Sequence, residues 1–175
     1  MDERCMNRLF RVTVFLFLHA GIVLAQNVQP LFVIERNTNS NSVYYEARIA
    51  PDSLFDARQP IHAYWIMWEK DHSGKTREEL TFIEREKGYG FRVKQNPGRK
   101  FFWFSIAPLP CRLIKVSLQN ATAVAETIID GHFSVLEKIT INAIEKNFLP
   151  HVKYIELFGR NAKSGEDTYE RIVNH

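Results

Sequence analysis

The sequence predicts a mainly β protein: a single-domain antiparallel β-sandwich or barrel of about nine or ten strands, with one short helix near residues 77–87. Two observations support this fold. Apolar and polar residues alternate with a period of two over most of the chain, as they do in half-buried strands. Turn-forming residues, such as Asn96-Pro97-Gly98 and Asp130-Gly131, separate these segments.

The N-terminal residues have the pattern of a cleavable export signal. Three arginines precede an apolar run from Val12 to Ala25. This run is short for a membrane span, which needs roughly 17–25 residues, and fits the apolar core of a signal peptide. We therefore expect residues 1–25 to be a signal peptide cut before Gln26, and residues 26–175 to form an exported domain, periplasmic or secreted. A buried N-terminal helix or an uncleaved anchor is the alternative.

The first strands are predicted by alternation and by a turn. Residues 31–36 and 43–49 flank a polar turn and are expected to form a hairpin. Residues 63–68 are apolar at both even and odd positions. A strand of this kind is covered on both faces, so we expect it in the centre of the sheet.

The predicted helix depends on a capping signal. Thr76 and Glu79 match a capping box, in which each side chain satisfies a free backbone N–H at the start of a helix. A strand centred on Leu80, Phe82 and Glu84 is the alternative for the same segment.

The rest of the chain predicts three more hairpins and one strand between them. The first of these hairpins turns at Asn96-Pro97-Gly98, the second at Asp130-Gly131 and the last at Lys163-Ser164-Gly165. The predicted strands are residues 91–94, 101–106, 113–118, 123–129, 133–144, 152–158 and 168–173.

The composition excludes some classes of function. The chain has 23 Lys and Arg against 20 Asp and Glu, a net charge of +3, and the two signs are interspersed. A nucleic-acid-binding surface needs a clustered basic stripe, so none is expected. Cys111 is the one cysteine of the predicted domain, so no internal disulfide forms, and we expect its thiol to be buried. After signal cleavage no apolar segment is long enough to span a membrane.

Several motifs in order along the chain carry a family resemblance. They are LFVIERN at 31–37, AYWIM at 63–67, REEL at 77–80 through YGF at 89–91, and YIELFG at 154–159. In these motifs the chain resembles the bacterial domain family DUF4833, over about residues 31–172. It departs from the family at residues 51–59. The resemblance implies one exported domain, and it implies no activity because the family has none assigned.

Aromatic residues are the first candidates for a binding site. Residues 101–104 must place two aromatic side chains on each face of a strand, so at least one face should be covered by protein, partner or ligand. The alternative is that the aromatic residues are simply core. The candidates for ligand binding are Tyr64, Trp65, Tyr89, Phe91 and Trp103.

Adjacent Glu-Arg pairs are the second candidates. In each pair one charge must lie beside an apolar row of its strand, and a desolvated charge needs a partner. A carboxylate of this set is expected to meet Arg92, Arg112 or Arg160. A structural pair, or charges in water at strand ends, is the alternative. The candidates for a buried ion pair are Glu35, Arg36, Glu84, Arg85 and Arg112.

The sequence shows no catalytic motif, metal-ligand spacing or cofactor motif, so no catalytic residue, metal site or cofactor is predicted. The first hypothesis is an exported, non-enzymatic domain that binds an apolar ligand or a protein partner in the cell envelope. One alternative is a structural or assembly subunit of the envelope. Another is an exported hydrolase that uses Glu35, Glu84, Glu137 or Glu156 as acid or base.

Overall fold

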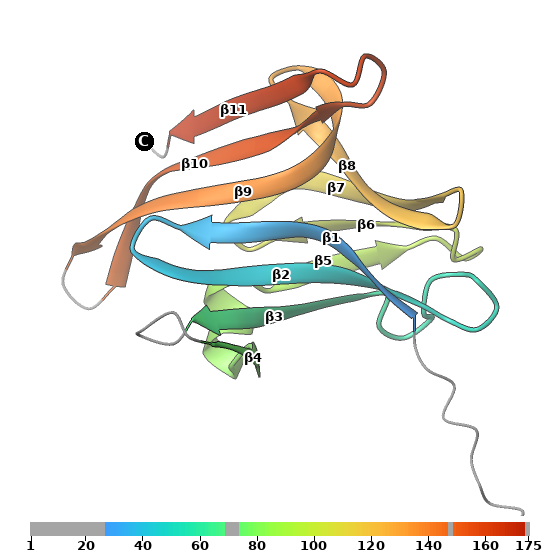
Figure 1. The fold of residues 1–175 in the computed structure, drawn as a ribbon, viewed down its shortest axis with the longest axis horizontal. Coiled ribbons are helices and arrows are strands. Elements are labelled where there is room, and N and C mark those ends of the chain that lie inside the picture. Colours follow the sequence, from blue (N-terminus) through green and yellow to red (C-terminus); the bar gives the residue numbers. More distant parts are fainter. Residues whose placement is uncertain (1–26, 69–73, 147–148, 174–175) are drawn as a thin grey trace, which may run out of the picture.

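The computed structural model describes residues 27–68, 74–146 and 149–173. The predicted signal peptide lies outside these residues. Within them, 11 strands form one mostly antiparallel sheet that curls into a half-barrel (Figure 1). The predicted mainly β fold with one short helix is therefore confirmed, with slightly more strands than expected.

The strands follow one another along the chain with one helical turn among them. No helix of the described residues is long and apolar enough to cross a membrane. The elements are β1 (Asn27–Arg36), β2 (Asn39–Ile49), β3 (Ile61–Trp68), β4 (Lys75–Glu79), the π-helix η2 (Glu84–Gly88), β5 (Phe91–Gln95), β6 (Phe101–Ile106), β7 (Leu109–Gln119), β8 (Thr122–Ile129), β9 (His132–Lys146), β10 (Leu149–Asn161) and β11 (Asp167–Val173).

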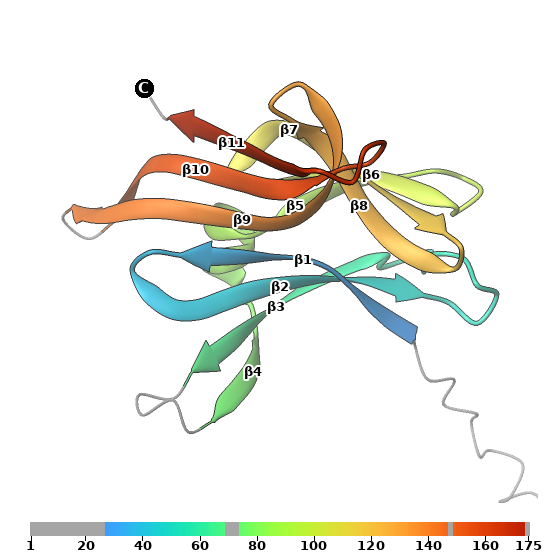
Figure 2. The same ribbon diagram turned by 45° about the horizontal axis from the view of Figure 1, so that its top comes forward.

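The long strand β9 joins the parts of the sheet. On one edge it pairs first with β8 through residues 132–135 and then with β1, in parallel, through residues 138–141. On its other edge it pairs with β10, which pairs with β11. Two arms therefore leave the same edge of β9, one running β1-β2-β3-β4 and the other β8-β7-β6-β5 (Figures 1 and 2).

The core lies where the two arms face each other. Phe32 of β1 stacks on Phe104 of β6, with 6.1 Å between ring centroids, and Phe55 meets Phe102 edge to face at 4.9 Å. All four side chains are buried. Because side chains alternate along a strand, Trp103 lies on the opposite, outer face of β6, where it is half-buried.

The predicted hairpins are confirmed, because each turn joins strands that pair antiparallel. The helix prediction needs correction. Residues 77–79, expected to begin the helix, lie in strand β4 (75–79), and the helix is η2, at 84–88. The capping box that exists is Thr81 and Glu84: the Thr81 N–H and hydroxyl donate to Glu84 Oε2 at 2.8 Å, and the Glu84 N–H donates to the Thr81 hydroxyl at 3.3 Å.

Two further expectations differ from the structure. Strand β3 is not central: it is next to the edge strand β4, and its outward residues Tyr64 and Ile66 are half-buried. Cys111 is exposed and not buried. It lies near the start of β7, before the pairing with β8 begins at Lys115, so no neighbouring strand covers it on that side.

Gly159 is required where β10 crosses a bulge in its pairing with β9. A Cβ at this position lies 2.2 Å from the Val135 carbonyl oxygen and 2.8 Å from Ile129 Cδ1. We expect Gly159→Ala to lower the free energy of unfolding by about 3 kcal/mol, because backbone must shift to make room. Urea unfolding measures this. Gly88→Ala is the control: nothing lies within 4 Å of its added Cβ, and an equal loss in both variants would contradict the assignment.

Candidate functional site

The outer face of the β5–β8 arm carries exposed apolar side chains. Leu113 on β7 is 58% exposed, Ile128 on β8 is 53% exposed and Phe133 on β9 is 48% exposed. Ile128 and Phe133 are direct partners across the β8–β9 hairpin. Together with Trp103 on β6, these residues form a continuous apolar surface that we call the Trp103 face.

Two adjoining grooves run over the Trp103 face, and both are lined by Trp103 and Leu113. The first, of about 500 Å³, lies along β5 and β6, and the second, of about 450 Å³, extends to Ile128 and Phe133. The second groove also contains the buried carboxylate of Glu126, which accepts a hydrogen bond from Gln119 Nε2 at 3.0 Å.

The two ends of the Trp103 face differ in charge. At the β5 end, Arg92 and Lys94 line the first groove, and their side chains make no hydrogen bond or ion pair with another described residue. At the other end, Arg112 is paired with Glu170 and donates to the Ile128 carbonyl. The β5 end is therefore the basic end of an apolar surface.

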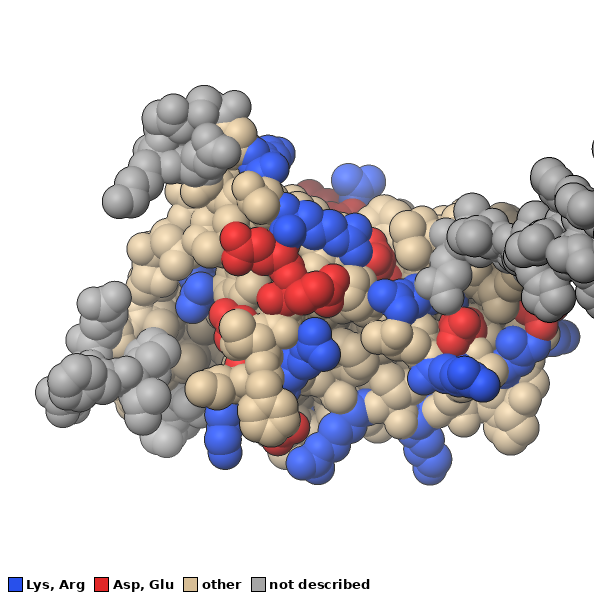
Figure 3. All heavy atoms as spheres, turned by 90° about the horizontal axis from the view of Figure 1, so that it is seen from below, with Lys and Arg blue, Asp and Glu red and all other residues tan. Residues whose placement is uncertain are grey.

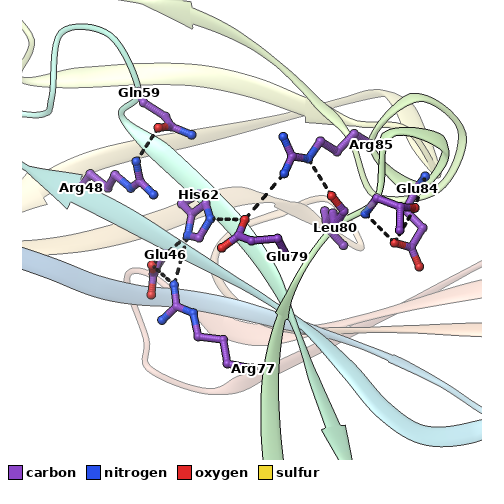
Figure 4. Close-up of polar contacts among 10 residues, drawn as sticks. Glu46, Arg48, Gln59, His62, Arg77, Glu79, Leu80, Glu84 and Arg85 are labelled. Atoms are coloured by element: carbon purple, nitrogen blue, oxygen red, sulfur yellow. Dashed lines mark hydrogen bonds and ion pairs between the residues drawn. The ribbon is translucent and has the colours of Figure 1, made fainter.

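A second group of polar side chains lies across the outer face of β2, β3 and β4 (Figure 4). His62 Nδ1 is 3.0 Å from Glu46 Oε1, and His62 Nε2 is 2.9 Å from Glu79 Oε2. Arg77 Nη2 donates to the same Glu46 oxygen at 2.9 Å. Arg85 extends from η2 toward Glu79, at 3.6 Å. We call these five residues the His62 cluster.

The His62 cluster can satisfy its hydrogen bonds with the ring in two protonation states. A ring protonated on both nitrogens donates to Glu46 and to Glu79. A ring protonated only on Nε2 donates to Glu79 and accepts at Nδ1 from Arg77, whose Nη2 is 3.2 Å away. In either state both ring nitrogens have a hydrogen-bond partner within the cluster.

Burial and hydrogen bonding shift the pKa of Glu46 in opposite directions. Burial alone raises the pKa of this carboxyl, but hydrogen bonds from His62 and Arg77 and their charges outweigh it, and the pKa is lowered. At Tyr64, burial and the neighbouring Glu46 raise the pKa of the phenol. The Arg77 guanidinium lies 3.5 Å from the centre of the Tyr64 ring, so the two side chains make a cation–π contact.

The contacts of the His62 cluster hold the edge of the sheet together. Glu46 comes from β2, His62 from β3, Arg77 and Glu79 from β4, and Arg85 from η2. All five residues of β4 are exposed, so this strand has little apolar burial of its own. The molecule seen from below carries acidic and basic side chains next to one another (Figure 3). Among the described residues, no three His, Cys, Asp or Glu side chains are grouped to hold a metal ion.

The aromatic residues singled out from the sequence lie in different environments. Trp65 and Tyr89 are buried and meet edge to face at 5.0 Å. Phe91 packs against the core from β5, and Tyr64 belongs with the His62 cluster. Trp103 is the one of the five that lies on the open apolar face with its two grooves.

The charged candidates are also divided. Arg36 points inward, and its guanidinium lies 4.7 Å from the Trp65 ring. Glu84 accepts a hydrogen bond from Trp65 Nε1 at 2.9 Å. Burial raises the pKa of the Glu84 carboxyl, but hydrogen bonds from Thr81 and Trp65 and the charge of Arg36 outweigh it and lower the pKa. The structure thus brings Arg36 and Glu84 together around Trp65.

The other charged candidates lie elsewhere. Glu35 pairs with Lys138 at 3.4 Å on the surface. Arg85 donates to the Leu80 carbonyl at 2.9 Å, and Arg112 pairs with Glu170.

The carboxylates considered for hydrolysis have separate partners. Glu137 pairs with Arg160 at 3.0 Å. Glu156 accepts from the Tyr169 hydroxyl at 2.6 Å and from Arg171 at 2.8 Å. Glu35 pairs with Lys138, and Glu84 accepts from Thr81 and Trp65. These hydrogen bonds and ion pairs are separate, although Glu35 and Glu156 flank Thr140 of β9 and the Lys138 charge acts on both.

Sequence reasoning missed the His62 cluster. Glu46 and His62 are direct partners in the β2–β3 register, and Tyr64 and Glu79 are partners in β3–β4. One signal was present: Glu46 and His62 are polar residues inside strongly apolar strands. The register that joins them depends on the irregular connection of residues 50–60, which alternation alone does not set.

Replacing His62 should destabilise the fold. Without the ring, the buried Glu46 carboxylate keeps only Arg77. We expect His62→Ala to lower the free energy of unfolding by roughly 2 kcal/mol. His132→Ala, at an exposed position on β9, is the control and should change it little. Thermal unfolding of both variants tests this, and an unchanged melting temperature for His62→Ala would refute it.

The lowered pKa of Glu46 predicts a dependence of stability on pH. Because the folded pKa is below the ordinary value of 4.5, the unfolded chain binds more protons in acid. The contribution of Glu46 is therefore complete well above 4.5 and is lost as the pH falls through the folded pKa. We expect the difference in unfolding free energy between the protein and Glu46→Gln to shrink over this range, measured by urea unfolding at a series of pH values.

Glu86→Gln is the control for this series, because Glu86 makes no hydrogen bond or ion pair with a described residue. The prediction would be contradicted if the difference in unfolding free energy between the protein and Glu46→Gln stayed constant as the pH is lowered.

Comparison with known proteins places the chain in a family. The model of the family described as "Domain of unknown function (DUF4833)" matches residues 32–171, which include β2–β10, η2, half of β1 and most of β11. No curated protein and no solved structure matches the chain significantly. The chain belongs to the DUF4833 family.

Proposed function

We propose that this protein is an exported, non-enzymatic binding domain of the cell envelope, and that its Trp103 face holds a segment of another protein. The observation that carries the proposal is the exposed apolar surface formed by Trp103, Leu113, Ile128 and Phe133, with two adjoining grooves. Contiguous apolar surface of this kind is a feature of interaction sites. Export is inferred from the basic and apolar pattern before Gln26.

The openness of the surface favours a protein segment over a small apolar ligand. A small-molecule site encloses about 70–90% of its ligand. The Trp103 face is instead spread over four strands, and three of its four side chains are about half exposed. The space between the two arms is occupied by Phe55, Phe102 and Phe104, all essentially inaccessible.

The charge at the β5 end favours an acidic partner. Arg92 and Lys94 have no ionic partner among the described residues and lie beside the apolar groove. A second copy aligned so that the two β5 ends meet would bring like charges together, which disfavours that form of self-association. The partner we propose therefore presents apolar side chains next to acidic ones.

Selection from displayed short random peptides tests this proposal. We expect the purified protein to enrich peptides in which aromatic or aliphatic residues neighbour Asp or Glu. Binding of these peptides should weaken by at least about tenfold in Trp103→Ser/Leu113→Ser, because a central aromatic side chain contributes most of the affinity of such a surface. The control Val28→Ser/Val173→Ser removes exposed apolar side chains elsewhere and should bind normally.

Three results would overturn the proposal. They are peptides whose binding is the same in both double variants, saturable binding of a fatty acid at the Trp103 face in place of peptides, and a dimer in sedimentation that the Trp103→Ser/Leu113→Ser change dissociates. The second would favour a small apolar ligand and the third an assembly subunit.

A further inference from the structure

A separate cavity of about 380 Å³ lies between η2 and the paired ends of β5 and β6. Arg85 and Lys87 reach it from η2, Arg92 from β5, and the Ser105 hydroxyl from β6. Glu86 is the one carboxylate in its lining. Three cations and one carboxylate leave a local charge of +2, and we call this cavity the cationic pocket.

Two of these cations are available to a ligand. The side chains of Lys87 and Arg92 make no hydrogen bond or ion pair with another described residue. Arg85 is partly engaged, because it donates to the Leu80 carbonyl and lies 3.6 Å from Glu79. An anion in the pocket would therefore complete the ionic contacts of Lys87 and Arg92.

The segment that carries Arg85 and Lys87 is held firmly. Gly90 passes so close to the Arg85 carbonyl oxygen that a Cβ would lie 1.5 Å from it. Burial raises the pKa of Tyr45, which keeps its hydroxyl protonated, and the hydroxyl donates to the Tyr89 carbonyl at 2.7 Å. The bond from Trp65 to Glu84 fixes the other end of η2. The backbone that carries Arg85 and Lys87 is thus fixed before any ligand binds, so less backbone entropy is lost on binding.

The cationic pocket is continuous with the Trp103 face. Arg92 lines both this pocket and the first groove. Arg92 is the cross-strand partner of Ser105, and Lys94 is the partner of Trp103. These two pairs are two residues apart along their strands, so they lie on the same face, roughly 7 Å from each other.

We propose that the cationic pocket binds carboxylates of an acidic protein segment, and that it receives the acidic part of the partner whose apolar part lies on the Trp103 face. The identity of the partner rests on the proposed function, whereas carboxylate binding by the pocket does not.

Titration with a short oligoglutamate peptide, followed by NMR of the purified protein, tests the proposal. We expect saturable shift changes at the amides of Lys87, Gly90 and Arg92, which weaken as salt is added. Lys87→Gln/Arg92→Gln should reduce the affinity by about fivefold or more, the loss expected for two solvent-exposed ion pairs. The control Lys153→Gln/Lys163→Gln removes two exposed charges elsewhere and should keep the affinity.

The variant Trp103→Ser/Leu113→Ser separates this proposal from the proposed function. Oligoglutamate has no apolar part, so this variant should bind it normally even if the Trp103 face binds nothing. Equal weakening in both charge variants, an absence of saturable shifts at the pocket, or binding of inorganic phosphate there without binding of oligoglutamate would each overturn the proposal.

Discussion

The rest of the structure depends on the pairing of both edges of β9. One edge of this strand carries β8 and then β1, end to end, and the other carries β10. Since both arms leave the same edge, they curl toward each other, and the aromatic side chains of β1, β2 and β6 meet between them. The outer face of the β1–β4 arm then carries the His62 cluster, and the outer face of the β5–β8 arm carries the Trp103 face.

The two arms use their outer faces differently. On the β1–β4 arm, the His62 cluster joins three strands through charged hydrogen bonds and reaches η2 through the Arg85–Glu79 ion pair. On the β5–β8 arm, the outer residues are apolar and exposed, with unpaired cations at one end. The element between the arms, η2, takes part in both, because Arg85 contacts Glu79 on one side and lines the cationic pocket on the other. Hydrogen bonds and ion pairs between side chains thus stabilise one face, while apolar side chains stay exposed on the other.

What the sequence predicts well is local. The hairpins follow from turn residues such as Asp130-Gly131, whose φ angles are both positive. The Thr-x-x-Glu pattern occurs twice, at Thr76 and at Thr81, and only the second caps the helix. The first motif lies in strand β4, which pairs with β3 and places Thr76 opposite Met67, so no helix begins there. Local pattern alone does not distinguish the two, because the choice depends on a neighbouring strand.

The features that sequence reasoning missed are non-local. The His62 cluster requires the registers of two strand pairs to be known together. The Trp103 face was partly foreseen, because residues 101–104 place aromatic side chains on both faces of a strand. Its other members, Leu113, Ile128 and Phe133, follow from the order of β6 to β9 in the sheet.

The parallel pairing of β1 with β9 has a consequence for how the chain folds. The Asn37 side chain extends this pairing by a pair of hydrogen bonds with the backbone of Ala143, 106 residues along the chain. Contacts between such distant residues are entropically costly and form late, so folding rates fall as they accumulate. The β1–β4 arm can form its hairpins early but cannot join the sheet until β9 has been synthesised. A newly made chain therefore stays without its completed core for most of its synthesis.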